Sequence, residues 1–349
     1  MELMQKNLKA ICSKILRSFP MLEVCYKLRF LGPLHIDGLG TGFYETAEPV
    51  VRSDTLSAAV AVNWLRLFPQ DAESLFENPP WQASSAFPFW RKFLFFPRPV
   101  ASKAVYLTLE KVDQAKNLKK IQWLELSLWK ETFRYLALSE VEGREHWFEN
   151  ITYDYGSLGI DKDLYGEFPH KWKLWQEEER PRIAVDRSGD SAADGQIFHF
   201  SRIHYDPQGG LFFLARFEEN AEQEKFEAAL QLLGDSGLGS DRTSGHGHFD
   251  FTKTDAPDFS AVKQSITLSL VNPDPESDIS ENWLDGAAYD LTQRGGWISG
   301  ESWRKAGLRM FCEGSCFSGK LSGRIVEVGE HPRFQHKIYR DGRAFMVGG

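Results

Sequence analysis

The stretch from Gly234 to Phe249, GDSGLGSDRTSGHGHF, constrains the fold of this chain more than any other. Five glycines lie within fourteen residues of it. Glycine at this density allows positive φ angles and lets another molecule approach the main-chain N–H groups closely. Successive exposed N–H groups bind phosphate oxygens. The stretch therefore indicates a loop that can cradle an anion.

The flanking residues place this loop between a helix and a strand. Ala221 to Leu233 spaces its apolar residues along one helix face, with Gly234 expected at the helix C-cap. Gly247 to Phe251 alternates as a strand does. A P-loop needs a lysine where this chain has His246, and a dinucleotide-binding fingerprint needs the strand before the loop. Neither phosphate motif fits, and a long surface turn is the alternative interpretation.

The charge of the whole chain limits how it binds nucleic acid. The 349 residues carry a formal net charge of −8, which excludes a generally basic nucleic-acid binder. Contacts with a polyanion must therefore come from local patches. The charge is uneven, because Lys320 to Gly349 is basic whereas Glu218 to Asp235 is strongly acidic.

Cysteine content and hydropathy indicate a cytoplasmic protein without cofactor or metal. The four cysteines do not make a disulfide framework, and Cys312 and Cys316 have no second pair with which to hold zinc. No apolar run approaches the ~18 residues of a membrane span, so no membrane contact is expected. Residues 1–20 are interrupted by three lysines and an arginine, which rules out a secretory signal and marks an N-terminal extension.

The first part of the chain has the pattern of half a ferredoxin-like unit. Val24 to Leu31 alternates as a strand, and Ser53 and Asp54 offer an N-cap for a helix that ends near Pro69. The next segment, Pro79 to Val100, looks irregular, with aromatic residues among basic ones. Such rings either stack on bases or bury the segment against the domain, and burial is favoured because an exposed aromatic cluster lowers solubility.

The remaining chain predicts one helix, two hairpins and a second domain. Val112 to Phe133 has helical spacing. Arg182 to Asp186 and Gln196 to Tyr205 indicate the strands of a hairpin with a long tip, and a second hairpin is expected to turn at Asp206 to Gly210. Alternating strands after Lys263 indicate a smaller α+β domain.

Several short motifs, each weak alone, become fairly specific through their order and spacing. They are Gly32-Pro33-Leu34-His35-Ile36, Arg52 to Leu56, Ser85 to Pro88, Pro97-Arg98-Pro99, Ala184 to Arg187, Leu232 to Gly234 with the glycine loop, and Arg294-Gly295-Gly296. Together they resemble the RAMP-superfamily subunit of type III-A (Csm) CRISPR effector complexes that caps the 5′ end of the crRNA. The resemblance covers roughly Leu22 to Val347 and departs from the family pattern at Ser240 and Asp241.

This resemblance implies an α+β fold with two ferredoxin-like (RRM-type) domains, a glycine-rich loop and an inserted β-hairpin thumb. The implied divisions are an extension (1–20), an N-terminal domain (21–258) that contains the thumb and the loop, and a C-terminal domain (259–349). It also implies a non-catalytic subunit that holds the repeat-derived 5′ handle of the crRNA. Its implied partners are the large polymerase-like signalling subunit and a RAMP backbone subunit.

The RNA-binding residues follow partly from chemistry and partly from the resemblance. Arg242, Thr243 and Ser244 suit phosphate and sugar contacts, and His246 or His248 can stack on a base. The resemblance assigns Gly239 to Gly247 to the glycine loop and Arg182 to Arg202 to the thumb. The predicted RNA-binding set is Ser53, Asp54, Arg98, Arg187, Gly239, Arg242, Thr243, Ser244, Gly245, His246, Gly247 and Arg294.

Two other functions stay open at this point. Related RAMP proteins cleave precursor RNA with histidine or tyrosine, and His35, His204 and His246 are the candidates here for a metal-independent general acid or base. A purely protein-binding scaffold is the second alternative, because the acidic residues from Glu218 to Glu227 could contact a basic partner. That alternative leaves the glycine loop without a role.

Overall fold

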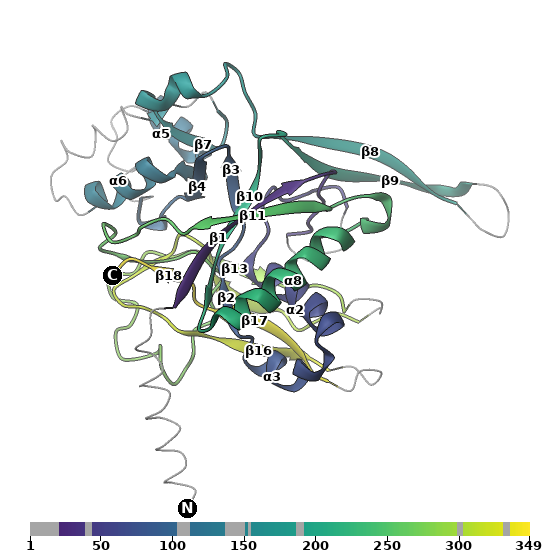
Figure 1. Ribbon diagram of the computed structural model, residues 1–349. Helices are drawn as coiled ribbons and strands as arrows, with labels where there is room; N and C mark the ends of the chain where they lie inside the picture. Colours follow the sequence, from purple (N-terminus) through teal and green to yellow (C-terminus); the bar gives the residue numbers. More distant parts are fainter. Residues whose placement is uncertain are drawn as a thin grey trace, which may run out of the picture.

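One large sheet forms the centre of the fold (Figure 1). The computed structural model describes residues 21–38, 44–102, 112–136, 151–152, 155–185, 192–298, 303–330 and 336–349. Within these residues the sheet has nine strands in the order β11-β1-β10-β3-β4-β5-β7-β6, with β2 also paired to β10. Their bounds are β1 (Leu22–Phe30), β2 (Trp81–Ala83), β3 (Phe87–Trp90), β4 (Phe93–Pro97), β5 (Trp123–Glu125), β6 (Ile151–Thr152), β7 (Leu158–Asp161), β10 (Gly209–Phe217) and β11 (Phe249–Asp255).

Four of these strands and two helices form the part of the sheet that carries the glycine loop. Helix α2 (Ser53–Leu67) follows β1, and helix α8 (Asn220–Ser236) joins β10 to β11. β1 pairs antiparallel with both β10 and β11, and β10 pairs antiparallel with β3. The chain order β1-α2-β3-β10-α8-β11 repeats the β-α-β-β-α-β order of a ferredoxin-like unit. The mixed α+β class is thus confirmed, whereas the second such unit remains a prediction.

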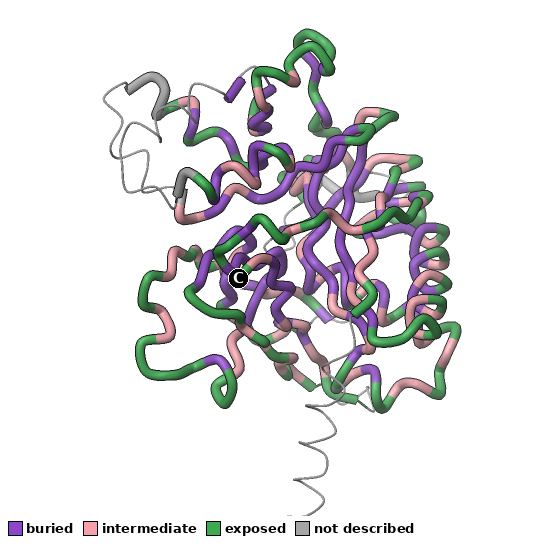
Figure 2. Tube along the Cα trace, turned by 60° about the vertical axis from the view of Figure 1, so that its left-hand side comes forward, coloured by how far each residue is buried: buried purple, intermediate pink, exposed green. Residues whose placement is uncertain are grey.

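The aromatic segment after α2 is regular, which corrects the expectation of an irregular loop. It forms β2, β3 and β4, and β4 is buried along its whole length. Phe87 contacts Phe96 and Phe212, and Phe96 contacts Trp129. Figure 2 shows the centre of the molecule as mostly purple, buried tube. Because both faces of these strands are covered, they have no polar alternation, and the burial interpretation of the aromatic residues is confirmed.

The single helix expected from Val112 to Phe133 is two helices with a strand between them. Helices α5 (Val112–Lys120) and α6 (Leu126–Leu136) flank β5. Trp123 and Leu124 are buried where β5 pairs with β4 and β7. Sheet pairing therefore overrides the helical spacing of this segment. Among the described residues, the other helices are α3 (Ala72–Glu77) and the short turns η1 (Pro69–Asp71), η2 (Val100–Ser102), η3 (Lys162–Glu167) and η4 (Arg242–Ser244).

A long hairpin projects from the body of the molecule (Figure 1). It consists of β8 (Trp175–Val185) and β9 (Ala192–Tyr205), which pair antiparallel from Trp175 opposite Tyr205. The predicted hairpin is confirmed and begins seven residues earlier than Arg182. The second predicted hairpin is wrong, because β9 pairs with β8 whereas β10 enters the large sheet.

Beyond β11 the chain forms small sheets with short strands. β12 pairs with β15 and β18, β13 pairs with β14, and β16 pairs with β17. Their bounds are β12 (Ser265–Thr267), β13 (Leu291–Arg294), β14 (Leu308–Phe311), β15 (Cys316–Phe317), β16 (Gly323–Gly329), β17 (Ile338–Arg343) and β18 (Met346–Val347). Ile266 and Leu268 belong to the same hydrophobic core as the large sheet, and the boundary at residue 259 remains a prediction.

Candidate nucleic-acid interface

The glycine loop begins one turn later than expected. Helix α8 continues through Gly234 to Ser236, and its C-cap is Gly237, whose φ of +84° is left-handed. A Cβ atom on Gly234 would lie 2.4 Å from the carbonyl oxygen of Phe249. Gly234 therefore permits close packing of α8 on β11 and is not the C-cap, which corrects the prediction.

The two ends of the loop are fixed to the segment that follows β1. The Gly247 N–H donates to the Pro33 carbonyl at 2.8 Å, and the Ser240 N–H donates to the His35 carbonyl at 3.1 Å. The Leu31 N–H donates to the His248 carbonyl at 2.8 Å. These backbone bonds hold residues 237–248 in one place although the loop carries little apolar surface.

The crest of the loop faces solvent. Arg242 to Ser244 form the η4 turn between two left-handed residues, Asp241 with φ +62° and Gly245 with φ +82°. Arg242, Thr243, Ser244 and Gly245 are all exposed, as is Gly239. The structure thus presents a guanidinium, two hydroxyls and a glycine backbone together, which are groups that bind phosphate and sugar.

Two predicted contact residues of the loop lie below this crest. His246 is 3% exposed, and its Nδ1 lies 3.7 Å from a carboxylate oxygen of Asp241. Burial lowers the pKa of His246, although Asp241 opposes that effect. Gly247 is buried, and a Cβ there would lie 1.8 Å from the Leu238 carbonyl oxygen. Stacking of His246 on a base does not fit this burial, so these two residues shape the loop.

The hairpin lies directly against the glycine loop. Arg182 of β8 forms an ion pair with Asp241, and its guanidinium carbon lies 4.2 Å from the centre of the Phe200 ring. The Phe200 ring lies 5.8 Å from the His246 ring. Arg182 lies opposite Phe198 in the hairpin ladder. Every second residue of β8 and of β9, counted from this pair, therefore lies on the hairpin face that contacts the glycine loop. The structure therefore joins two segments that the sequence analysis treated separately.

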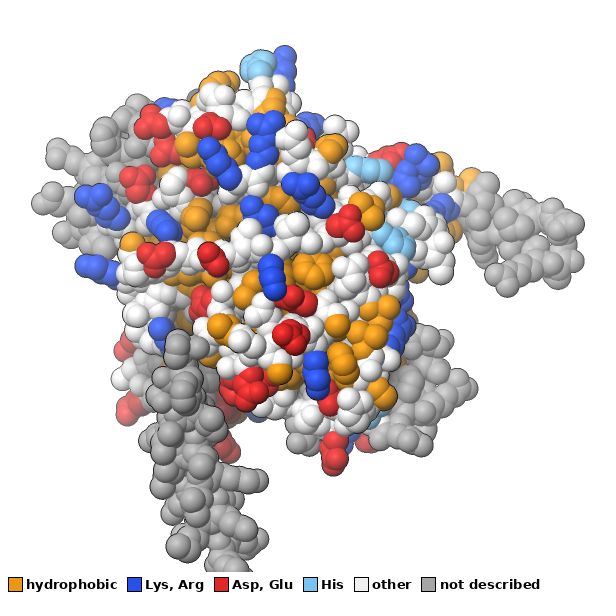
Figure 3. Space-filling model, in the orientation of Figure 1, with side chains coloured by type: hydrophobic (Ala, Val, Ile, Leu, Met, Phe, Trp, Pro, Cys, Tyr) orange, Lys and Arg blue, Asp and Glu red, His pale blue; other side chains and the backbone are white. Residues whose placement is uncertain are grey.

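We call this region the loop–hairpin surface. It comprises Asp241 and the exposed loop residues Arg242 to Gly245, the facing hairpin residues Glu178, Arg180, Arg182, Phe198, Phe200, Arg202 and His204, and the adjacent Tyr44. Four arginines stand here against the two carboxylates of Glu178 and Asp241, in a chain whose net charge is −8. Arginine and histidine side chains can be seen along the described part of the hairpin in Figure 3.

Salt bridges hold the basic side chains of the hairpin in place. Glu178 accepts hydrogen bonds from Arg180 at 2.6 Å, from Arg202 at 2.9 Å and from His204 at 2.8 Å. These contacts lower the pKa of Glu178 to about 2, the bond from Arg180 contributing most. The carboxylate therefore stays ionised at neutral pH and fixes the positions of its three partners.

Sequence reasoning missed the aromatic part of this surface. Tyr44 is 46% exposed, and its ring stacks on Phe200 with centroids 5.7 Å apart. Phe198 is also exposed and lies 5.8 Å from Tyr44. The alternation Phe198-His-Phe200-Ser-Arg202 was a usable signal for one aromatic and basic face. The approach of Tyr44 from a distant segment had no signal in the sequence.

Two predicted residues lie inside the molecule instead of at this surface. The buried Asp54 carboxylate accepts hydrogen bonds from Nε of Arg294 at 3.0 Å and from Arg340. Burial alone would raise the pKa of Asp54, but the two arginines lower it overall. Because Asp54 and Arg294 satisfy each other away from solvent, direct RNA contact by their side chains does not fit the structure.

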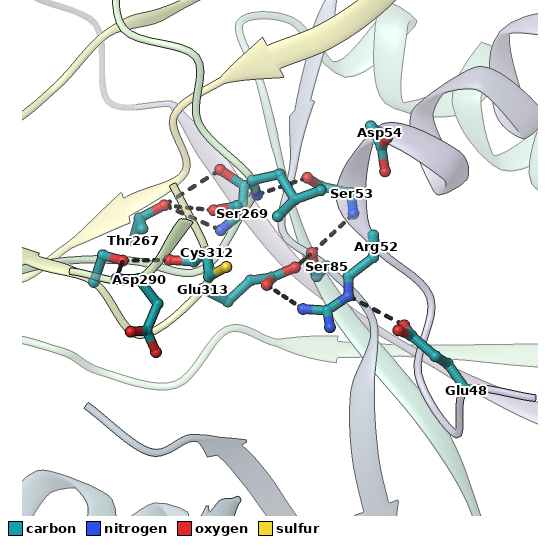
Figure 4. A network of polar contacts seen from close by, with 12 residues as sticks. Glu48, Arg52, Ser53, Asp54, Ser85, Thr267, Ser269, Asp290, Cys312 and Glu313 are labelled. Atoms are coloured by element: carbon teal, nitrogen blue, oxygen red, sulfur yellow. Dashed lines mark hydrogen bonds and ion pairs between the residues drawn. The ribbon is translucent and has the colours of Figure 1, made fainter. Parts of the chain in front are cut away.

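Ser53 belongs to a second buried network, drawn in Figure 4. Its Oγ accepts a hydrogen bond from the Leu270 N–H at 3.0 Å, and its own N–H donates to Ser85 Oγ at 2.8 Å. Ser85 donates in turn to Glu313, which also pairs with Arg52 at 2.5 Å. Arg52, and not Ser53, occupies the N-cap of α2. Ser53 therefore connects α2 to the C-terminal part of the chain and is not available to RNA.

Of the two remaining predicted arginines, Arg98 lies away from the loop–hairpin surface. Arg98 follows β4 and donates to the Leu118 carbonyl at 2.7 Å. β4 stands four positions from β11 in the sheet order, which at ~4.8 Å per strand places these two strands about 19 Å apart across the sheet. Arg187 lies outside the described residues.

The three histidines considered for RNA cleavage do not form an accessible pair. His35 is completely buried, with Nδ1 2.6 Å from the Ser201 carbonyl oxygen, and His246 is nearly so. The His204 side chain is 43% exposed but bound to Glu178. A general acid or base must reach the reacting hydroxyl, and His35 and His246 cannot do so in this conformation.

The described part of the chain offers no grouped metal ligands and no membrane-spanning helix. Those residues contain no group of three or more His, Cys, Asp or Glu side chains placed to hold a metal ion. None of the helices described is long and apolar enough to span a membrane.

Comparison with known proteins connects the chain to one family. Residues 260–348 match the CRISPR Csm4 C-terminal domain. A CRISPR system Cms protein Csm4 from Mycobacterium tuberculosis is 31% identical over 163 residues, 44% of this chain and 52% of that protein, so the match spans about half of the relative's length. The Csm4 protein of Streptococcus thermophilus is 25% identical over 303 residues, which cover 83% of this chain and 88% of that protein.

Solved structures share the fold. A chain in the crystal structure of the Csm3-Csm4 subcomplex of the type III-A CRISPR-Cas interference complex gives a TM-score of 0.62 at 16% identity, covering 94% of this chain and 99% of that chain. A chain in the Csm1-Csm4 cassette with pppApA gives 0.58 at 18% identity, covering 94% and 98%. These similarities confirm the resemblance seen in the sequence: the chain is similar to Csm4 proteins in sequence and shares the fold of chains in two Csm4-containing structures.

Proposed function

We propose that this chain is a non-catalytic RNA-binding subunit of a type III-A CRISPR interference complex and that it holds the 5′ repeat-derived handle of the crRNA. The observation that carries the proposal is the loop–hairpin surface. It places the exposed crest of the glycine loop beside a hairpin face that is both basic and aromatic.

The chemistry of this surface suits single-stranded RNA. Arg242, Thr243 and Ser244 offer donors for phosphate and ribose oxygens, while Tyr44 and Phe198 offer exposed rings for bases. A surface of this kind grips the backbone without reading much sequence. It therefore fits a constant segment of RNA that must be held in one register.

The partners follow from the family. The related proteins occur in solved structures of a Csm3-Csm4 subcomplex and a Csm1-Csm4 cassette. By analogy, this chain joins the large signalling subunit to a RAMP backbone subunit in the cytoplasm. The division into two ferredoxin-like domains at 21–258 and 259–349, and a thumb role for the β8–β9 hairpin, form part of the same proposal.

The experiment compares one loop variant with a matched control. The purified chain is incubated with 5′-labelled repeat-spacer RNA without metal, and the samples are run on native and denaturing gels. Arg242→Ala removes an exposed arginine of the crest, whereas Arg309→Ala removes an exposed arginine of β14. Losing one phosphate contact should weaken binding about tenfold and flatten the dependence of log K on log salt by about 0.7.

Each gel result decides between functions. Intact RNA that is shifted by wild type and by Arg309→Ala, and shifted about tenfold less well by Arg242→Ala, supports the proposal. Equal binding by all three proteins would contradict the role of the loop. A discrete shorter RNA on the denaturing gel, absent with His204→Ala, would show that the chain is an endoribonuclease.

A further inference from the structure

The ion pair between Arg182 and Asp241 connects the hairpin to the glycine loop near the crest of the loop. Arg182 is 34% exposed and Asp241 is 20% exposed, so solvent reaches both side chains. The Arg182 guanidinium rests against the Phe200 ring at 4.2 Å, which fixes its plane. A guanidinium held this way presents parallel N–H groups that suit a carboxylate and a phosphate equally well.

The hairpin arginines differ in where their anionic partner comes from. Glu178, on the hairpin itself, pairs with Arg180 and Arg202. Asp241, the partner of Arg182, belongs to the loop. Replacing Asp241 with another anion therefore leaves the pairing inside the hairpin unchanged.

The backbone places Asp241 at the edge of the exposed crest. It adopts a left-handed conformation with φ +62° immediately before the η4 turn. Its carboxylate is a single negative charge beside Arg242, Thr243, Ser244 and Gly245, all of which are exposed. A negative charge there opposes the approach of a polyanion unless it moves away from the RNA path.

We propose that the Asp241 carboxylate occupies a phosphate subsite on Arg182 in the free chain, and that a phosphate of the bound RNA displaces it. This inference rests on the proposed function. The subsite consists of Arg182, stacked on Phe200, and takes one phosphodiester group of a single strand. Asp241 thus lowers the affinity for RNA while it keeps Arg182 in position.

The test is the Asp241→Asn variant, because asparagine has the same shape and tolerates the left-handed conformation. Freeing Arg182 and removing one negative charge should raise the affinity for 5′-labelled repeat-spacer RNA about three- to tenfold. The salt dependence of log K should steepen by about 0.7, since one more phosphate contact releases counterions. In an Arg182→Gln background the same change should alter affinity by less than about twofold.

A matched control separates this subsite from net charge. Asp250→Asn makes the same change of charge at an exposed position of β11 and should change affinity less than about twofold. If Asp241→Asn weakens binding, or strengthens it equally with Arg182→Gln present, the subsite is refuted and Asp241 is a structural clamp. If wild type and every variant fail to bind the RNA, the proposed function itself fails.

Discussion

Two glycines of the same loop allow a paired test of how the crest is built. Gly245→Ala and Gly247→Ala make the same chemical change at left-handed positions, with φ of +82° and +71°. A Cβ atom at position 245 would meet nothing within 4 Å, whereas one at position 247 would lie 1.8 Å from the Leu238 carbonyl oxygen and 2.7 Å from its nitrogen. The two variants therefore share the conformational cost and differ in the steric one.

The expected losses of stability follow from these contacts. Both variants pay ~1–2 kcal/mol for alanine in a left-handed conformation, reduced by ~0.4–1 kcal/mol from the stiffer unfolded chain. Gly245→Ala should therefore lose about 1 kcal/mol. Gly247→Ala must also move the backbone and break its bonds to Leu238 and Pro33. At ~1 kcal/mol for each hydrogen bond, its total loss should reach about 3 kcal/mol.

Urea denaturation followed by fluorescence measures both free energies of unfolding. We expect Gly247→Ala to lose about 2 kcal/mol more than Gly245→Ala, with RNA binding weakened along with it. Equal losses, within ~0.5 kcal/mol, would refute the idea that the packing of Gly247 against Leu238 holds the loop in place.

Three further predictions concern the buried charges and the histidines. Asp54→Asn leaves Arg294 and Arg340 buried without their anion and should lower the free energy of unfolding by about 3–5 kcal/mol; urea melts would show this, with the exposed Asp250→Asn nearly unchanged. The pKa of Asp54 is lowered in the folded state, so its contribution is complete above ~pH 4 and disappears as pH falls through the lowered value; an Asp54→Asn protein should lack this part of the acid-unfolding curve. His35→Ala and His204→Ala should leave RNA as intact as wild type does on denaturing gels, and a cleavage product from wild type alone would contradict this.

The sequence predicted correctly those helices, strands and loops whose structure depends on residues close together in the chain. The glycine loop, the α8 helix before it and the strand after it were all predicted, because helical spacing and glycine density are properties of neighbouring residues. The β8–β9 hairpin was predicted for the same reason. The exposed residues Arg242 to Gly245 are found where the sequence analysis expected an anion cradle.

Errors arose where distant contacts decide the outcome. The spacing around Trp123 was helical, yet pairing with β4 and β7 makes this segment a strand. Asp54 and Arg294 are polar residues in recognisable motifs. The sequence could not show that they form a buried hydrogen-bonded ion pair, because they lie 240 positions apart. The meeting of Arg182 with Asp241 was hidden in the same way, although each residue lay in a segment already expected to bind RNA.

The central claim is that RNA lies on the loop–hairpin surface. Crosslinking tests it most directly, with the assembled complex loaded with a crRNA that carries 4-thiouridine at successive handle positions, followed by mass spectrometry of the crosslinked peptides. We expect crosslinks to peptides from residues 237–248 and from the described part of the hairpin, at 175–185 and 192–205. Crosslinks confined to α5, α6 or the β13–β14 ribbon, with none at the loop or the hairpin, would contradict the claim.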